Sequence, residues 1–96
     1  MANCYIIHSE SLNRFYTGIT TDSVEERLIK HNDGSYGAHR FTSKASDWKI
    51  FLIIELTDYS HAVRLEKFIK SQKSAKYIQN LKKNPELVEK IVLRTK

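Results

Sequence analysis

The feature that most constrains the fold is one strand-like segment that is apolar on both faces. It runs from Trp48 to Thr57 around the five-residue stretch Ile50-Phe51-Leu52-Ile53-Ile54. A strand of this kind is buried by layers on both sides, so we expect it inside a sheet. The apolar stretch is far shorter than the roughly 18–20 residues needed to cross a membrane. The segment therefore predicts a globular domain built around a sheet.

Local periodicity divides the rest of the 96-residue chain into strands and helices. Strands at 4–7 and 15–20 are expected to form a hairpin. A helix at 24–31 should follow, opened by a Ser23–Glu26 capping box and closed at Asn32-Asp33-Gly34. The remaining expected elements are a polar loop at 33–47, the strand at 48–57, and helices from about 60, at 74–82 and from 85. The order β-β-α-β-α-α, with a possible C-terminal helix, predicts an α/β (α+β) fold. One domain is expected over 1–96, with a core at about 4–82 and a helical extension at 83–96.

Positive charge is concentrated near the C-terminus. Residues 1–60 hold six Lys/Arg against eight Asp/Glu, whereas residues 61–96 hold ten against three. A basic segment on a near-neutral body is expected of a protein that binds a polyanion. A solvated, lysine-rich helical surface accounts for the same counts.

Cysteine use and the N-terminal residues bear on the compartment. Cys4 is the single cysteine, so no internal disulfide is possible. No basic-then-apolar leader opens the chain, and we expect a cytoplasmic protein. Nothing in the sequence indicates a membrane or an obligate protein partner.

Five side chains could carry chemistry if the fold brings them together. Tyr5 and Tyr16 lie on the two strands of the hairpin, close to opposite each other if the turn is centred near residues 10–11. Arg27 and His31 are an i, i+4 pair on one helix face, and Glu66 lies at the edge of a helical apolar stripe. Taken singly, these residues are more often packing tyrosines, a solvated helix face and a surface charge.

Together these residues resemble the GIY-YIG nuclease superfamily, and most of all its small, single-domain bacterial type. The resemblance runs from about Cys4 to Leu81, through Cys4-Tyr5-Ile6, Tyr16-Thr17-Gly18, Arg27-Leu28-Ile29-Lys30-His31-Asn32, Phe41-Thr42-Ser43-Lys44 followed by Trp48, and Glu66-Lys67-Phe68-Ile69-Lys70 with Ala62 before it. The first motif has Asn3-Cys4 in place of Gly-Ile, and the second has Thr17 in place of isoleucine. The tyrosines and Gly18 are kept.

The resemblance implies a three-stranded antiparallel sheet flanked by helices, and a metal-dependent endonuclease that hydrolyses phosphodiester bonds in DNA with one divalent ion, Mg²⁺ or Mn²⁺. It implies catalytic roles for Tyr5, Tyr16, Arg27, His31 and Glu66. A lone carboxylate such as Glu66 suits a hard cation that keeps several waters, and Arg27 matches phosphate oxygens. A tyrosine hydroxyl near cations can activate water, and histidine can relay its proton.

Further residues are expected to meet the nucleic acid or support the site. Lys67, Lys70, Lys73 and Lys76 are the predicted phosphate contacts of the basic helices, and His39 is a further contact from the polar loop. Gly18 allows the strand to run close to substrate or to its neighbour. The partner is DNA, although these residues do not distinguish it from RNA. The alternative is a catalytically weak nucleic-acid-binding module on the same scaffold.

Overall fold

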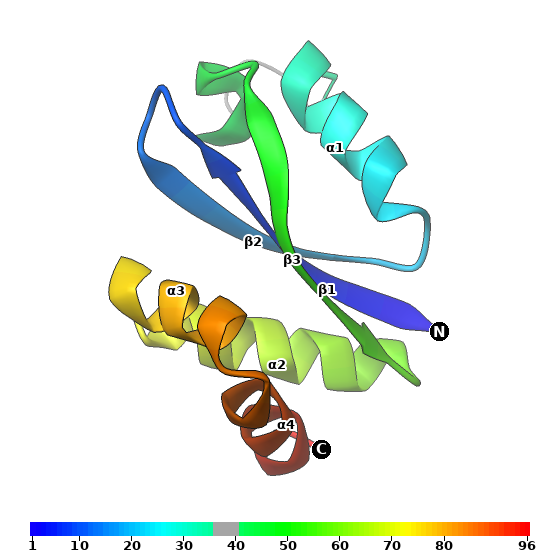
Figure 1. The fold of residues 1–96 in the computed structure, drawn as a ribbon. Coiled ribbons are helices and arrows are strands. Elements are labelled where there is room, and N and C mark those ends of the chain that lie inside the picture. Colours follow the sequence, from blue (N-terminus) through cyan, green and yellow to red (C-terminus); the bar gives the residue numbers. More distant parts are fainter. Residues whose placement is uncertain (36–40) are drawn as a thin grey trace.

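The computed structural model describes residues 1–35 and 41–96, and in that part of the chain it contains a three-stranded sheet and four α-helices (Figure 1). The elements are β1 (Ala2–Ser9), β2 (Arg14–Thr20), α1 (Val24–Asp33), the short 3₁₀ helix η1 (Phe41–Lys44), β3 (Trp48–Leu56), α2 (Tyr59–Ser71), α3 (Ala75–Lys83) and α4 (Pro85–Arg94). The predicted α+β fold and element order are confirmed, and the C-terminal helix is present. The 3₁₀ helix lies in the segment predicted as loop.

The central strand is β1, not the long apolar segment. The sheet order is β2-β1-β3, with β1 antiparallel to both neighbours, so the prediction that the 48–57 strand lies inside the sheet is wrong. Strand β3 is an edge strand in which Ile53 is 42% exposed. Strand β1 is almost entirely buried because Cys4 and Ile6 point to one face while Tyr5 and Ile7 point to the other. The apolar run of β1, Cys4-Tyr5-Ile6-Ile7, is shorter than the 50–54 run of β3, so the length of the run did not indicate the central strand.

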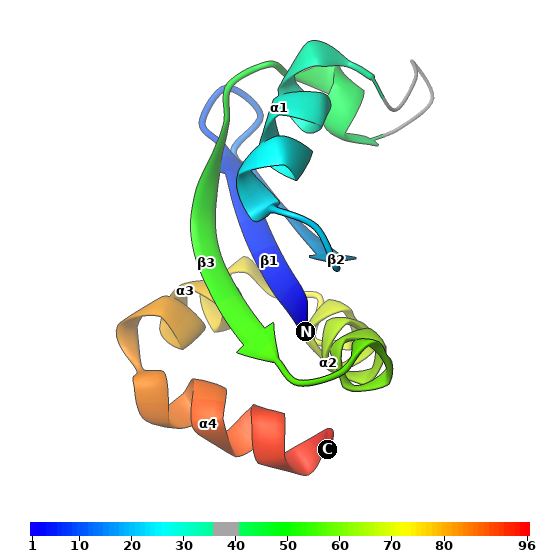
Figure 2. The same cartoon turned by 90° about the vertical axis from the view of Figure 1, so that its right-hand side faces the viewer.

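Helices cover the two faces of the sheet unequally. Helix α1 packs over the face that carries Tyr5 and Ile7, where it forms a small core with Trp48. Helices α2, α3 and α4 gather below the opposite face, as the view turned by 90° shows (Figure 2). Leu65 of α2 and Ile91 of α4 are buried in this larger core. In the described part of the chain, no helix has both the length and the apolar character of a membrane span.

The hairpin places the two predicted site tyrosines on one face but not opposite each other. Tyr5 is paired with Gly18, and Tyr16 is paired with Ile7. The turn is therefore centred between Ser11 and Leu12, about one residue later than expected. The tyrosines become diagonal neighbours, still within reach of each other.

Local signals fix the ends of the helices that carry site residues. Ser23 Oγ accepts a hydrogen bond from the Glu26 amide at the start of α1, and Gly34 ends that helix in the left-handed region with φ of 76°. Ser74 caps α3 in the same way by accepting from the Tyr77 amide. The predicted cap at Ser23 is confirmed, whereas α1 ends at Asp33 rather than at the predicted His31 and the Ser74 cap was not predicted.

Candidate active site

A buried hydrogen-bond chain joins the hairpin to α1 and η1. The Tyr5 hydroxyl is 2.8 Å from His31 Nε2, and the other ring nitrogen, Nδ1, is 2.8 Å from Thr42 Oγ1. Tyr5, His31 and Thr42 are 3%, 4% and 3% exposed. Because both ring nitrogens are engaged, the imidazole is fixed in position and orientation.

Thr42 was not assigned a role from the sequence, although its segment contributed to the family resemblance. Its backbone carbonyl accepts a hydrogen bond of 2.7 Å from Trp48 Nε1. The Asn32 side chain in turn bonds both the amide and the carbonyl of Trp48, at 2.7 and 3.0 Å. Trp48 is 2% exposed, as expected of a core residue. Its ring therefore holds the threonine that orients His31.

Gly18 leaves room for the two tyrosine rings. A Cβ atom at this position would lie 2.6 Å from both Cζ and the hydroxyl of Tyr5, and 3.1 Å from Cε2 of Tyr16. Any larger residue would therefore displace the Tyr5 ring from the position in which it reaches His31. The predicted close approach is thus one between Gly18 and the tyrosine opposite it.

Tyr16 connects this pair to the other face of the sheet. Its ring centroid lies 5.1 Å from that of His31, and Lys70 Nζ lies 5.6 Å from the Tyr16 centroid. Lys70 Nζ is also 3.4 Å from Glu66 Oε2. Both charged residues come from α2, on the opposite face from the tyrosines, so the contact passes around the β2 edge of the sheet.

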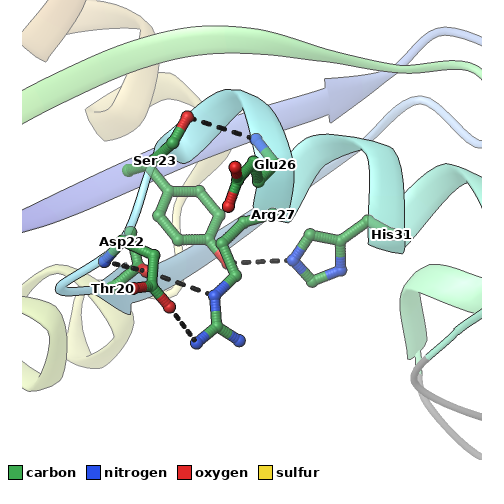
Figure 3. A network of polar contacts seen from close by, with 7 residues as sticks. Thr20, Asp22, Ser23, Glu26, Arg27 and His31 are labelled. Atoms are coloured by element: carbon green, nitrogen blue, oxygen red, sulfur yellow. Dashed lines mark hydrogen bonds and ion pairs between the residues drawn. The ribbon is translucent and has the colours of Figure 1, made fainter.

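Arg27 lies one turn before His31 on α1. Figure 3 shows Arg27 and His31 leaving the same side of the helix, as their spacing predicts. Arg27 Nε donates to Thr20 Oγ1 at 3.1 Å, and one terminal nitrogen is 3.6 Å from Asp22. Thr20 also accepts from the Asp22 amide, so this buried threonine, which the sequence did not single out, fixes the guanidinium.

The structure brings the predicted catalytic residues near one another around His31, with Arg27 one turn before it on α1. Tyr5 and Tyr16 both contact His31, and Tyr5 and His31 are buried. Glu66 joins them through Lys70 and Tyr16. Lys67, Lys70, Lys73 and Lys76 are exposed, and His39 lies outside the described residues.

A groove of about 400 Å³ opens beside Tyr16. It runs between the end of the hairpin and the junction of α2 with α3, and its lining includes Arg14, Tyr16, Lys70 and Lys73. Of the five predicted catalytic residues, Tyr16 is the one that lines it. We call this space the β2-edge groove.

The metal ion implied by the family fits Glu66 only in part. Within residues 1–35 and 41–96 there is no group of three or more His, Cys, Asp or Glu side chains that could hold a metal ion. Glu66 is partly exposed, with 18% of its side chain accessible, and its carboxylate oxygens are the hard ligands that Mg²⁺ and Mn²⁺ prefer. One carboxylate fits an ion that takes its remaining ligands from water and substrate phosphate.

The lone thiol lies close to this carboxylate but has different chemistry. Burial raises the pKa of Cys4 to about 12, and the negative charge of Glu66 adds to that shift. The thiol is therefore protonated at neutral pH and is a packing residue of β1.

Comparison with known proteins identifies the family. The sequence model of the GIY-YIG catalytic domain matches residues 1–81. A "UPF0213 protein" from Syntrophus aciditrophicus (strain SB) is 35% identical over 71 residues, covering 74% of this chain and 79% of that protein. No solved structure matches the chain significantly. The chain belongs to the GIY-YIG family, a nuclease superfamily, and the resemblance found in the sequence is confirmed.

Proposed function

We propose that this protein is a metal-dependent endonuclease that hydrolyses phosphodiester bonds in DNA. The observation that carries the proposal is the buried chain from Tyr5 through His31 to Thr42, with the Tyr16 ring against His31. A histidine fixed at both nitrogens against a tyrosine hydroxyl is a proton-handling arrangement. Family membership supplies the class of reaction.

The Tyr5–His31 pair can take up the proton of an attacking water. In the tautomer with its proton on Nδ1, His31 donates to Thr42 Oγ1 and accepts the Tyr5 hydroxyl proton at Nε2. As the Tyr5 oxygen receives a proton from water, its own proton passes along the 2.8 Å bond to Nε2. Tyr16, the more exposed tyrosine, orients that water.

Charge on the phosphoryl oxygens requires cationic groups. Arg27 is 31% exposed and is fixed at Nε by Thr20, so its guanidinium can meet a phosphate in a defined orientation. Glu66 would hold the divalent ion, which stabilises developing negative charge during phosphodiester cleavage. Lys70 would balance the Glu66 carboxylate before the ion and substrate arrive.

The remaining expectations form part of the same proposal. The exposed lysines Lys67, Lys70, Lys73 and Lys76 would bind the DNA backbone, with His39 as a further contact. The chain would act as one domain over 1–96, with a core at about 4–82 and an extension at 83–96, in the cytoplasm. RNA carries the same type of linkage, so substrate choice needs a direct test.

The decisive experiment compares Glu66→Gln with the wild-type protein on plasmid, branched and single-stranded DNA in Mg²⁺ or Mn²⁺. Loss of the carboxylate should lower the cleavage rate by about 10³-fold or more, since stabilisation of transition-state charge is worth several kcal/mol. DNA affinity should stay equal or rise, because a negative charge facing a polyanion is removed. Glu89→Gln, an exposed change of the same kind on α4, should retain the wild-type rate.

The alternative, a catalytically weak binding module, is favoured by the exposed lysines alone. It would replace our proposal if the wild-type protein binds DNA in a salt-dependent manner and cleaves none of these substrates with any divalent metal. Cleavage that survives in Glu66→Gln, with contaminating nuclease excluded, would contradict the role given to this carboxylate.

A further inference from the structure

The β2-edge groove has the size and position of a binding subsite that adjoins the proposed active site. Its volume of about 400 Å³ falls within the range of roughly 300–1,000 Å³ typical of small-ligand sites. Tyr16 and Lys70 belong both to the groove and to the network that reaches His31 and Glu66. A ligand in the groove would therefore touch the proposed site directly.

The groove combines an apolar floor with a cationic rim. Phe15, Ile69 and Ile78 contribute apolar surface to its lining. Arg14 and Lys73 contribute positive charge, in addition to Lys70, and none of the described lining residues is acidic. Within residues 1–35 and 41–96, neither Arg14 nor Lys73 is paired with a carboxylate. The groove suits a ligand with a flat apolar part and a negative part.

Backbone conformation at the rim supports a role for Lys73. Asn13 and Lys73, with φ of 52° and 49°, are the non-glycine residues with positive φ in the described chain, and both line this groove. Asparagine adopts this conformation readily, whereas lysine does so at a cost that glycine would avoid. Lys73 follows the end of α2, where glycine is the usual residue. Its strained backbone places a cation at the groove.

We infer that the β2-edge groove is a subsite for one unstacked nucleotide of the bound DNA strand. The base would lie on the apolar floor beside Tyr16, and a flanking phosphate would meet Arg14, Lys70 and Lys73. Cations alone suit any polyanion, but an apolar floor beside an aromatic ring favours a nucleobase, which has a flat π face. The position of the strand rests on the proposed function.

Lys73→Gly is the sharpest test because it removes the positive charge without destabilising the fold. The change should raise the Tm by about 2–5 °C through relief of strain. It should also weaken binding of a labelled 12-nucleotide single strand by about 5–10-fold, measured by fluorescence anisotropy at low salt in EDTA. Lys90→Gln on α4 removes one charge away from the groove and should weaken binding less than twofold.

A second pair of variants tests occupation of the groove itself. Ala75→Glu places a larger, acidic side chain in the lining at the first turn of α3, where a carboxylate favours the helix. Gln79→Glu changes the charge equally, at an exposed position of the same helix outside the lining. Ala75→Glu should weaken binding at least fivefold more than Gln79→Glu.

Abasic nucleotides identify the part of the ligand that the floor binds. A single abasic site moved along the strand should lower wild-type affinity about fivefold or more at one position, and Ala75→Glu should abolish that dependence. Four results would each overturn the inference. They are an affinity that does not depend on the position of the abasic site, equal binding by the two glutamate variants, binding of Lys73→Gly within twofold of Lys90→Gln, and no binding of DNA by the wild-type protein. Because binding is measured in EDTA, a position-specific result combined with no cleavage would refute the proposed function and leave the subsite standing.

Discussion

Replacement of Gly18 by alanine should disrupt the tyrosine–histidine pair by contact alone. The new Cβ would lie 2.6 Å from Tyr5 Cζ and from its hydroxyl, closer than such atoms can approach. Gly18 does not have a positive φ, so alanine introduces no backbone strain there. The Tyr5 ring is rigid and buried, and its hydroxyl is bonded to His31, so it cannot move aside without losing that bond.

The expected loss of stability is the sum of an overpacking cost, the cost of a lost hydrogen bond and an entropic offset. Overpacking of a well-packed site costs about 1–3 kcal/mol, and a buried polar group that loses its partner costs about 1–3 kcal/mol. Lower chain entropy in the unfolded state offsets about 0.4–1 kcal/mol. Gly18→Ala should therefore lower the free energy of unfolding by about 1–5 kcal/mol, a large part of the stability of a small domain.

Urea denaturation followed by Trp48 fluorescence measures this loss, because Trp48 is the single tryptophan and is buried in the same core. Gly34→Ala is the control: its φ of 76° strains an alanine, but nothing lies within 4 Å of the new Cβ. A Tyr5→Leu background should reduce the cost of Gly18→Ala by about 1–3 kcal/mol and leave that of Gly34→Ala unchanged. Equal stability of Gly18→Ala and the wild-type protein would refute the reasoning.

Two further changes test polar contacts of the hairpin. Hydrogen bonds from Ser9 and Ser11 lower the pKa of Asp47 from 3.8 to about 2, so the stability that this carboxylate provides should be present above pH 4 and lost as the pH falls towards 2. Asp47→Asn should flatten that part of the stability profile in acid titrations followed by fluorescence, and an unchanged profile would contradict the assignment. Tyr5→Phe removes a hydrogen bond from buried His31 and should lower the free energy of unfolding by about 1–3 kcal/mol. The NMR resonances of the His31 ring nitrogens should shift in this variant. Unshifted resonances would count against the Tyr5–His31 hydrogen bond.

Much of the fold and the residue types of the candidate site follow from local sequence patterns. The start of α1 after the Ser23 cap was predicted, and its end was predicted within two residues, because caps and left-handed residues act within one turn. The apolar stripe of α2, with Ala62, Leu65 and Ile69 buried, was predicted because periodicity alone defines a helix face. The five predicted site residues were chosen through the order and spacing of motifs that resemble the family.

The sequence by itself determined the order of the strands and α-helices, the helix starts within about one residue, and the family, since each depends on neighbours within a few residues or on recurring motifs. Only the tertiary structure decided that β1 is central, that the hairpin register sets Tyr5 over Gly18, and that the β2 edge brings Lys70 to Tyr16. Strand order and register depend on pairing between distant segments, and burial at one strand depends on what all the others cover. Thr42 acquires its place beside His31 in the same way, because the contact joins residues 11 positions apart and has no local pattern.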